Sequence, residues 1–122
     1  MEGRAMEGDR KRTIERREKI QKVVREAFPD KPIDIIRKEE YRGDGPNELR
    51  IRIREPQGPP RRILLILTEE FMTDVGFPFV GRVKEAIKIA KQKLTIPQKG
   101  FLGRIILTTT EIEWKPEEKE KR

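Results

Sequence analysis

Residues 48–67 decide the fold, and they read ELRIRIREPQGPPRRILLIL. In the first part of this stretch an apolar residue alternates with an arginine at every step. The apolar residues are Leu49, Ile51 and Ile53, and the arginines are Arg50, Arg52 and Arg54. Because strand side chains alternate between two faces, this pattern predicts a strand with one apolar and one basic face. After the Pro- and Gly-rich turn at 56–60, residues 61–67 are apolar on both faces and predict a central strand.

The remaining segments predict two long helices and two further strands around this pair. The predicted elements are a helix at 13–28, strands at 33–41, 48–55 and 61–67, a helical turn at 68–74, a helix at 78–94 and a strand at 104–114. The order α-β-β-β-α-β predicts one two-layer α+β domain over 13–114, with a mainly antiparallel sheet and the helices packed on one face. Residues 1–12 and 115–122 are almost purely polar, and we expect disordered ends there.

The composition lacks most of the side chains that enzymes use for catalysis. The chain has 122 residues and contains no Cys, no His and no Ser. Without them, disulfides, zinc–thiolate sites, thiol catalysis, the usual neutral-pH acid–base group and serine nucleophiles are excluded. We therefore expect a protein that is not an enzyme, with no catalytic residue, no cofactor and no bound metal.

Charge is the feature of the sequence that points most directly to a function, since the net charge is +7 and 42% of residues are charged. A basic surface of this size attracts phosphate polymers or anionic membranes, although it also serves solubility alone. No apolar run approaches the about 20 residues that span a bilayer, and the N-terminus lacks the apolar stretch of a signal peptide. We expect a cytoplasmic protein without a membrane partner. Its many Lys, Arg, Glu and Ile residues are typical of a thermophile.

The leading hypothesis is that the chain binds RNA or DNA through two basic surfaces. The candidate residues are Arg50, Arg52, Arg54, Arg82, Lys84, Lys88 and Lys91. Alternate strand residues lie about 7 Å apart, close to the phosphate repeat of an extended nucleic-acid strand, and Arg suits bidentate phosphate contacts. The helix residues lie on both flanks of a predicted apolar stripe, and the lysines support the strand arginines if the two surfaces are contiguous.

Each surface also has an interpretation without a ligand. The strand arginines can form a solvated face that is paired with carboxylates of a neighbouring strand, for which Glu39, Glu111 and Glu113 are the candidates. The helix lysines can lie along the margins of a buried face, with their stems on apolar residues and their ammonium groups in water.

Two rival functions remain. A protein-interaction module would use exposed apolar residues, and Phe77, Phe79 and Ile89 are the candidates. A Mg²⁺-dependent nuclease would use acids near a strand hairpin, with Asp44 as the first. The strand predicted at 61–67 lacks the Glu-x-Lys pattern of such nucleases, which counts against this function.

Two further motifs are short. Glu69, Glu70 and Asp74 can hold a metal ion, but acids near a helix start are also favoured by the helix dipole. The G-x-x-G pattern from Gly100 to Gly103 is one that KH domains place against a nucleic-acid backbone. Here it precedes a predicted strand, which favours a plain turn.

Five short segments, VREAFP at 24–29, IDII at 33–36, LTEEF at 67–71, VGRV at 80–83 and TEIEW at 110–114, are similar to segments of BolA-like proteins. The resemblance implies a type II KH-like layout of sheet and helices, which is compatible with nucleic-acid binding. The Arg-His pair of that family is absent, since Val83 follows Arg82 and the chain has no His. The glutaredoxin-linked iron–sulfur role of the family is therefore not carried over.

Overall fold

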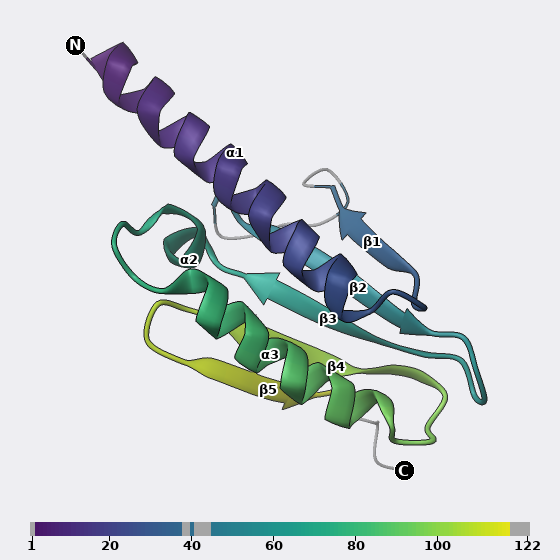
Figure 1. The fold of residues 1–122 in the computed structure, drawn as a ribbon. Coiled ribbons are helices and arrows are strands. Elements are labelled where there is room, and N and C mark those ends of the chain that lie inside the picture. The colour runs from purple at the N-terminus through teal and green to yellow at the C-terminus, as the bar shows by residue number, and fades with distance from the viewer. Residues whose placement is uncertain (1, 38–39, 41–44, 118–122) are drawn as a thin grey trace.

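The computed structural model describes residues 2–37, 40 and 45–117, and it has one five-stranded sheet with helices on one face (Figure 1). The elements are α1 (Glu2–Ala27), β1 (Ile33–Ile36), β2 (Leu49–Glu55), β3 (Arg61–Leu67), α2 (Glu69–Thr73), α3 (Phe79–Leu94), β4 (Gly100–Leu107) and β5 (Ile112–Pro116). The strands lie in chain order across the sheet, from β1 to β5. The prediction of an α+β fold with a mainly antiparallel sheet and helices on one face is confirmed.

The strand pairs follow from the connections between them. β1, β2 and β3 form an antiparallel meander, and β4 and β5 form an antiparallel hairpin. β3 and β4 are parallel, because the chain passes through α2 and α3 before it returns to the sheet. This crossover places α3 over β3 and β4, while α1 lies beside it over the other half of the sheet (Figure 1).

The core lies between the sheet and the two long helices. β2 contributes Ile51 and Ile53, and its neighbour β3 contributes Ile63 and Leu65 at the paired positions. These side chains are fully buried against apolar residues of both helices. The helix residues in this cluster are Ile20, Val24, Val83, Ala86, Ile87, Ala90 and Leu94. Burying one such aliphatic side chain stabilises the fold by roughly 1.5–3 kcal/mol, so the apolar half of the β2 pattern fixes which face the helices cover.

Three predicted boundaries are wrong. α1 begins at Glu2 rather than at Thr13, so the segment expected to be disordered is largely helical. Its N-terminal turns extend past the sheet (Figure 1), and no apolar periodicity marks them in the sequence. β1 ends at Ile36 rather than at Tyr41. The predicted strand at 104–114 is two strands, and the first of them begins at Gly100 rather than at Arg104.

Arg16 on α1 fixes the junction between α2 and α3. It is only 7% exposed, and its Nη1 donates a hydrogen bond to the Phe71 carbonyl at 2.8 Å. Its guanidinium lies over the rings of Phe79 and Phe77, at 4.6 and 5.4 Å from their centroids. Burial, followed by the nearby positive charge of Arg12, lowers the pKa of Arg16 below its usual value. Phe77 and Phe79 are therefore half-buried core-edge residues, and not the exposed apolar pair that a partner surface requires.

We predict that Gly103→Ala destabilises the protein, whereas Gly81→Ala does not. Gly103 has φ +152°, and a Cβ there would lie 2.5 Å from the Lys115 carbonyl oxygen and 2.7 Å from the Trp114 ring. Strain and overpacking of this kind cost roughly 1–3 kcal/mol. Nothing lies within 4 Å of a Cβ at Gly81 in α3, and Ala there stabilises the helix by up to about 1 kcal/mol. Urea unfolding of both variants measures the two effects, and equal stability of the two would contradict the prediction.

Candidate nucleic-acid interface

Arg50, Arg52 and Arg54 lie on the face of the sheet that is turned away from the helices. Their neighbours in β2 are buried under α1 and α3, and the arginines alternate with them. On this open face Arg50 is paired with Ile66 of β3, Arg52 with Leu64 and Arg54 with Arg62. The three arginines of β2 therefore lie beside two apolar side chains and a fourth arginine from the central strand β3.

A shallow groove of about 290 Å³ crosses this open face. It is lined by Ile36, Arg50, Arg52, Arg62, Leu64, Phe101 and Arg104, which we call the arginine groove. Its four guanidinium groups come from β2, β3 and β4, and its apolar lining comes from β1, β3 and β4. None of these lining residues, all from the described part of the chain, is acidic. Arg54 is on the same face but does not line the groove.

A β-bulge in β4 brings two of these residues to the same face. Phe101 is paired with Arg62 of β3, and Gly103 with Ile63, so Leu102 is the extra residue. Without the bulge, Phe101 and Arg104 would point to opposite faces, because they are three positions apart. With it, both lie on the open face, and Arg104 is paired with Leu64.

The strand arginines have carboxylate partners, but not the predicted ones. Asp34 of β1 accepts from Arg52 at 3.2 Å and from Arg54 at 2.9 Å, and Glu48 accepts from Arg50 at 3.0 Å. The predicted partner Glu39 lies outside the described residues. Glu113 is instead paired with Lys115, and Glu111 has no ion pair with a strand arginine among the described residues. The two pairs of Asp34 are half-exposed, and such ion pairs are worth about 0–1 kcal/mol, so a phosphate can compete for Arg52 and Arg54. The Glu48 carboxylate that holds Arg50 is buried.

Arg62 and Arg104 are less neutralised. Arg104 lies 3.7 Å from Glu117, near the limit for an ion pair. Arg62 has no ion pair within the part of the chain that the structure describes, and its guanidinium lies 5.6 Å from the centroid of the Phe101 ring. Neither residue was among the predicted site residues. The sequence shows both as basic residues at the starts of predicted strands. It does not show how these strands pair, and the pairing is what brings Arg62 and Arg104 beside the arginines of β2.

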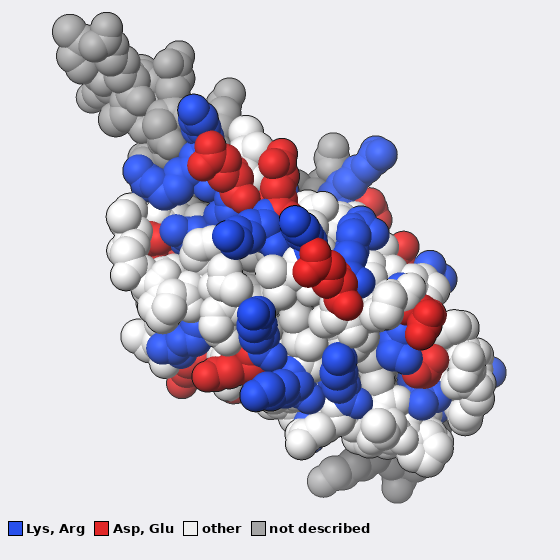
Figure 2. Space-filling view, in the orientation of Figure 1, with Lys and Arg blue, Asp and Glu red and all other residues white. Residues whose placement is uncertain are grey.

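The lysines of α3 lie on the opposite side of the molecule. A trough of about 710 Å³ runs between α1 and α3, and we call it the lysine groove. Its charged residues are Lys19, Lys22, Glu26, Lys84, Lys88 and Lys91, around an apolar floor. Figure 2 shows this face, with Lys and Arg side chains on both helices. The condition that the two basic surfaces be contiguous is therefore not met, and Arg82 lines neither groove.

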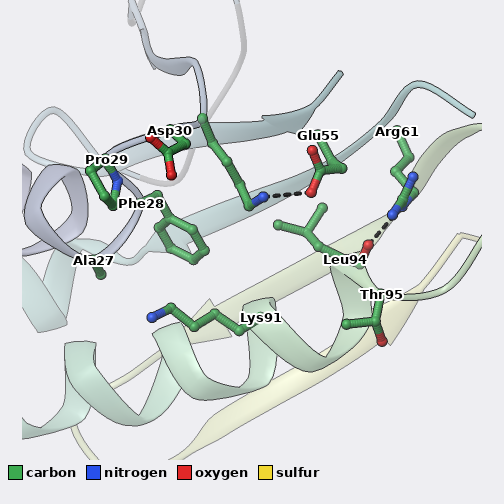
Figure 3. A pocket seen from close by; sticks show the side chains of 10 residues that line it. Ala27, Phe28, Pro29, Asp30, Glu55, Arg61, Lys91, Leu94 and Thr95 are labelled. Carbon is green, nitrogen blue, oxygen red and sulfur yellow. Dashed lines mark hydrogen bonds and ion pairs between the residues drawn. The ribbon is translucent and has the colours of Figure 1, made fainter. Parts of the chain in front are cut away.

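A third cavity, at the C-terminal ends of the helices, has its charges largely satisfied within the fold (Figure 3). Lys31 forms an ion pair with Glu55 at the end of β2. Arg61 donates through Nε to the Leu94 carbonyl at 2.7 Å and through Nη1 to the Pro59 carbonyl at 2.8 Å. Its Nη1 also donates to the Gln57 carbonyl at 3.0 Å. These contacts join the β2–β3 turn to the end of α3, and they indicate a structural role.

The acidic candidates also have structural partners. Glu69 accepts hydrogen bonds from the backbone and side chain of Asn47, at 2.7 and 3.0 Å. Glu70 accepts from Thr109 at 2.8 Å, and Asp74 accepts from the Val75 amide at 3.0 Å. Among the described residues no three acidic, His or Cys side chains gather in a way that fits a metal ion. Asp44, the candidate nuclease acid, lies outside the described residues.

The remaining candidates are placed as follows. Gly100 to Gly103 form the start of β4, and not a turn or loop of the KH kind. Ile89 is half-buried and packs against the core. The large apolar residues exposed in the described part are Ile14, Val75 and Ile96. Val75 and Ile96 lie at opposite ends of α3, so these residues form no single apolar patch.

Comparisons with protein-family models, with curated proteins and with solved structures find no match. The resemblance to BolA-like proteins therefore stays a prediction. None of the helices in the described residues combines the length and apolar character needed to cross a membrane.

We predict that the ion pair of Lys31 and Glu55 makes stability pH-dependent below about pH 4. The hydrogen bond from Lys31 lowers the pKa of Glu55. A carboxylate with a lowered pKa stabilises the fold above its unfolded-state pKa, and this stability is lost as pH falls through the folded-state value. The melting temperatures of wild type and Glu55→Gln should therefore differ at pH 7 and converge in acid. A difference that stays constant over this range would contradict the role assigned to the pair.

Proposed function

We propose that this protein is a non-enzymatic module that binds RNA or DNA through the arginine groove. The observation that supports this most is the groove lining, in which four guanidinium groups from three strands surround one hollow with no acidic residue among its described lining. Guanidinium is planar and presents several donors at once, so it suits bidentate contacts to phosphate. The net charge of +7 adds long-range attraction for a phosphate polymer.

The ion pairs that hold two of the four groove arginines also support this proposal. Arg50 and Arg52 are held by Glu48 and Asp34, and all four groove arginines extend from paired strands. Side chains that are already ordered lose less entropy when a ligand binds. The lysine groove lies on exposed helix surfaces, and its side chains are flexible ammonium groups. We assign it a secondary part in the proposal, as a source of attraction that is independent of sequence.

A protein-interaction module remains the alternative, and it has less support. Its candidate residues Phe77, Phe79 and Ile89 are half-buried against the core. Arg16 also covers both aromatic rings. A partner would therefore have to bind around these residues and not directly on them.

We expect steep, salt-dependent binding that weakens when the arginine groove loses charge. Labelled single- and double-stranded RNA and DNA are titrated with wild type and with the Arg62→Gln/Arg104→Gln variant over a salt series. Each lost phosphate contact reduces the slope of log K against log salt by about 0.7 on a single strand, so the double variant should lose about 1.4 units of slope.

Two controls separate the groove from general charge. Arg54→Gln removes one charge from the same face but outside the groove, and it should change the affinity little. Lys84→Gln/Lys88→Gln removes two charges from the lysine groove, and it should reduce the slope less than the arginine variant. No binding near about 50 mM salt would rule out the proposed function, and a larger effect of the lysine variant would move the site to the helix face.

A further inference from the structure

Phe101 differs from every other aromatic residue in the described chain. Phe28 and Phe71 are buried in the core, and Phe77, Phe79 and Trp114 pack against it. Phe101 belongs to neither group, although it is half-buried on the open face of the sheet. The interior of the protein therefore does not account for an aromatic ring at this position.

The surroundings of the Phe101 ring combine apolar contact with positive charge. The guanidinium carbons of Arg62 and Arg104 each lie 5.6 Å from the ring centroid. Leu64 and Ile36 line the same groove, and both are half-buried residues outside the core cluster. A ligand that fits this hollow has an apolar, planar part for the ring and an anionic part for the arginines.

A nucleotide with an unpaired base has both parts. Bases stack on aromatic side chains and on guanidinium planes, whatever their sequence. The groove, at about 290 Å³, is just below the range for small-ligand pockets, about 300–1,000 Å³, so it has room for one base and not for a longer segment. In a duplex the bases already stack on one another, so the outer surface offers mainly phosphates to this face. The aromatic and apolar lining of the groove therefore contributes fully to the binding free energy only when a base is unpaired.

The bulge at Leu102 and the glycine after it keep Phe101 in this position. A Cβ at Gly103 would overlap the backbone of β5, so β4 approaches β5 closely at the point where it turns Phe101 outward. Bulges commonly re-aim a side chain beside a functional site.

We propose that the arginine groove holds one unpaired base of a single-stranded nucleic acid against Phe101, while Arg62 and Arg104 contact the phosphates beside it. This inference rests on the proposed function and narrows its ligand from nucleic acid in general to single strands.

The test compares Phe101→Ala and Phe101→Leu with wild type on three probes. These are a labelled single strand of about 12 nucleotides, its duplex, and the same strand with abasic positions. One stacked base is worth about 1–3 kcal/mol, so Phe101→Ala should weaken binding of the intact strand by about 5- to 150-fold. Phe101→Leu keeps most of the apolar volume but removes the ring, so it should weaken binding of the intact strand by less than Phe101→Ala does. Neither variant should change duplex binding or the salt slope of the single strand.

The abasic strand gives the readout that a structural role would not change. Wild type should prefer the intact strand to the abasic one, and Phe101→Ala should bind both equally. Urea unfolding checks that both variants remain folded, and Phe101→Leu serves if the alanine variant does not. Binding of strand and duplex that is unaffected by Phe101, or weakened equally, would overturn this inference alone. No binding to any probe at low salt would overturn the proposed function as well.

Discussion

The parallel pairing of β3 with β4 is the constraint on which the rest of the structure depends. Because the two strands are parallel, the chain needs a crossover, and α2 and α3 provide it over one face of the sheet. Thr68, at the end of β3, donates through its backbone amide and its hydroxyl to the Leu107 carbonyl at the end of β4, at 3.2 and 2.8 Å. The crossover places α3 over the apolar side of β3 and β4, α1 lies over the rest of that side, and the other side of the sheet is left open (Figure 1). The same pairing aligns Arg62 with Phe101 and Leu64 with Arg104, so it also assembles the arginine groove.

Among the described residues, the open face has more positive charge than its ion pairs neutralise, and the carboxylates that pair with its arginines lie at the margins. Asp34 on β1 accepts from two arginines at once, so one positive charge of that trio is left uncompensated. Glu117 lies just beyond β5, while Arg62 at the centre has no ion pair among the described residues. The carboxylates thus orient the outer arginines without filling the groove. In the proposed function, a phosphate that contacts Arg50 or Arg52 meets a donor that is already positioned, which reduces the ordering cost of binding.

The sequence predicted the layers well and the site in part, for physical reasons that differ between elements. The period-two pattern of β2 is explicit, so both faces of that strand and the direction of its arginines could be predicted. The β4–β5 turn could not, because it is made of Thr108 to Glu111 and has none of the Gly, Pro or Asn residues that usually mark a turn. The bulge at Leu102 breaks the alternation, so Phe101 and Arg104 were not predicted to share a face. Asp34 is a partner of Arg52 only through the register of β1 on β2, which is a property of the fold and not of either segment.

The two grooves have different chemistry. In the proposed function, the arginine groove selects unpaired bases, and the lysine groove only attracts nucleic acid in general. The lysine groove has ammonium groups above aliphatic residues such as Val80 and Ile87, and none of its described lining residues is aromatic. Such a surface attracts any polyanion, because a lysine acts on phosphate as a point charge. The arginine groove has planar donors beside Phe101, and in the proposed function this combination distinguishes a free base from a paired one. Since the grooves lie on opposite faces, a single extended strand in the arginine groove leaves the lysines accessible. In the proposed function, selection for a free base therefore depends on the arginine groove alone, and the lysine groove adds attraction that is independent of sequence.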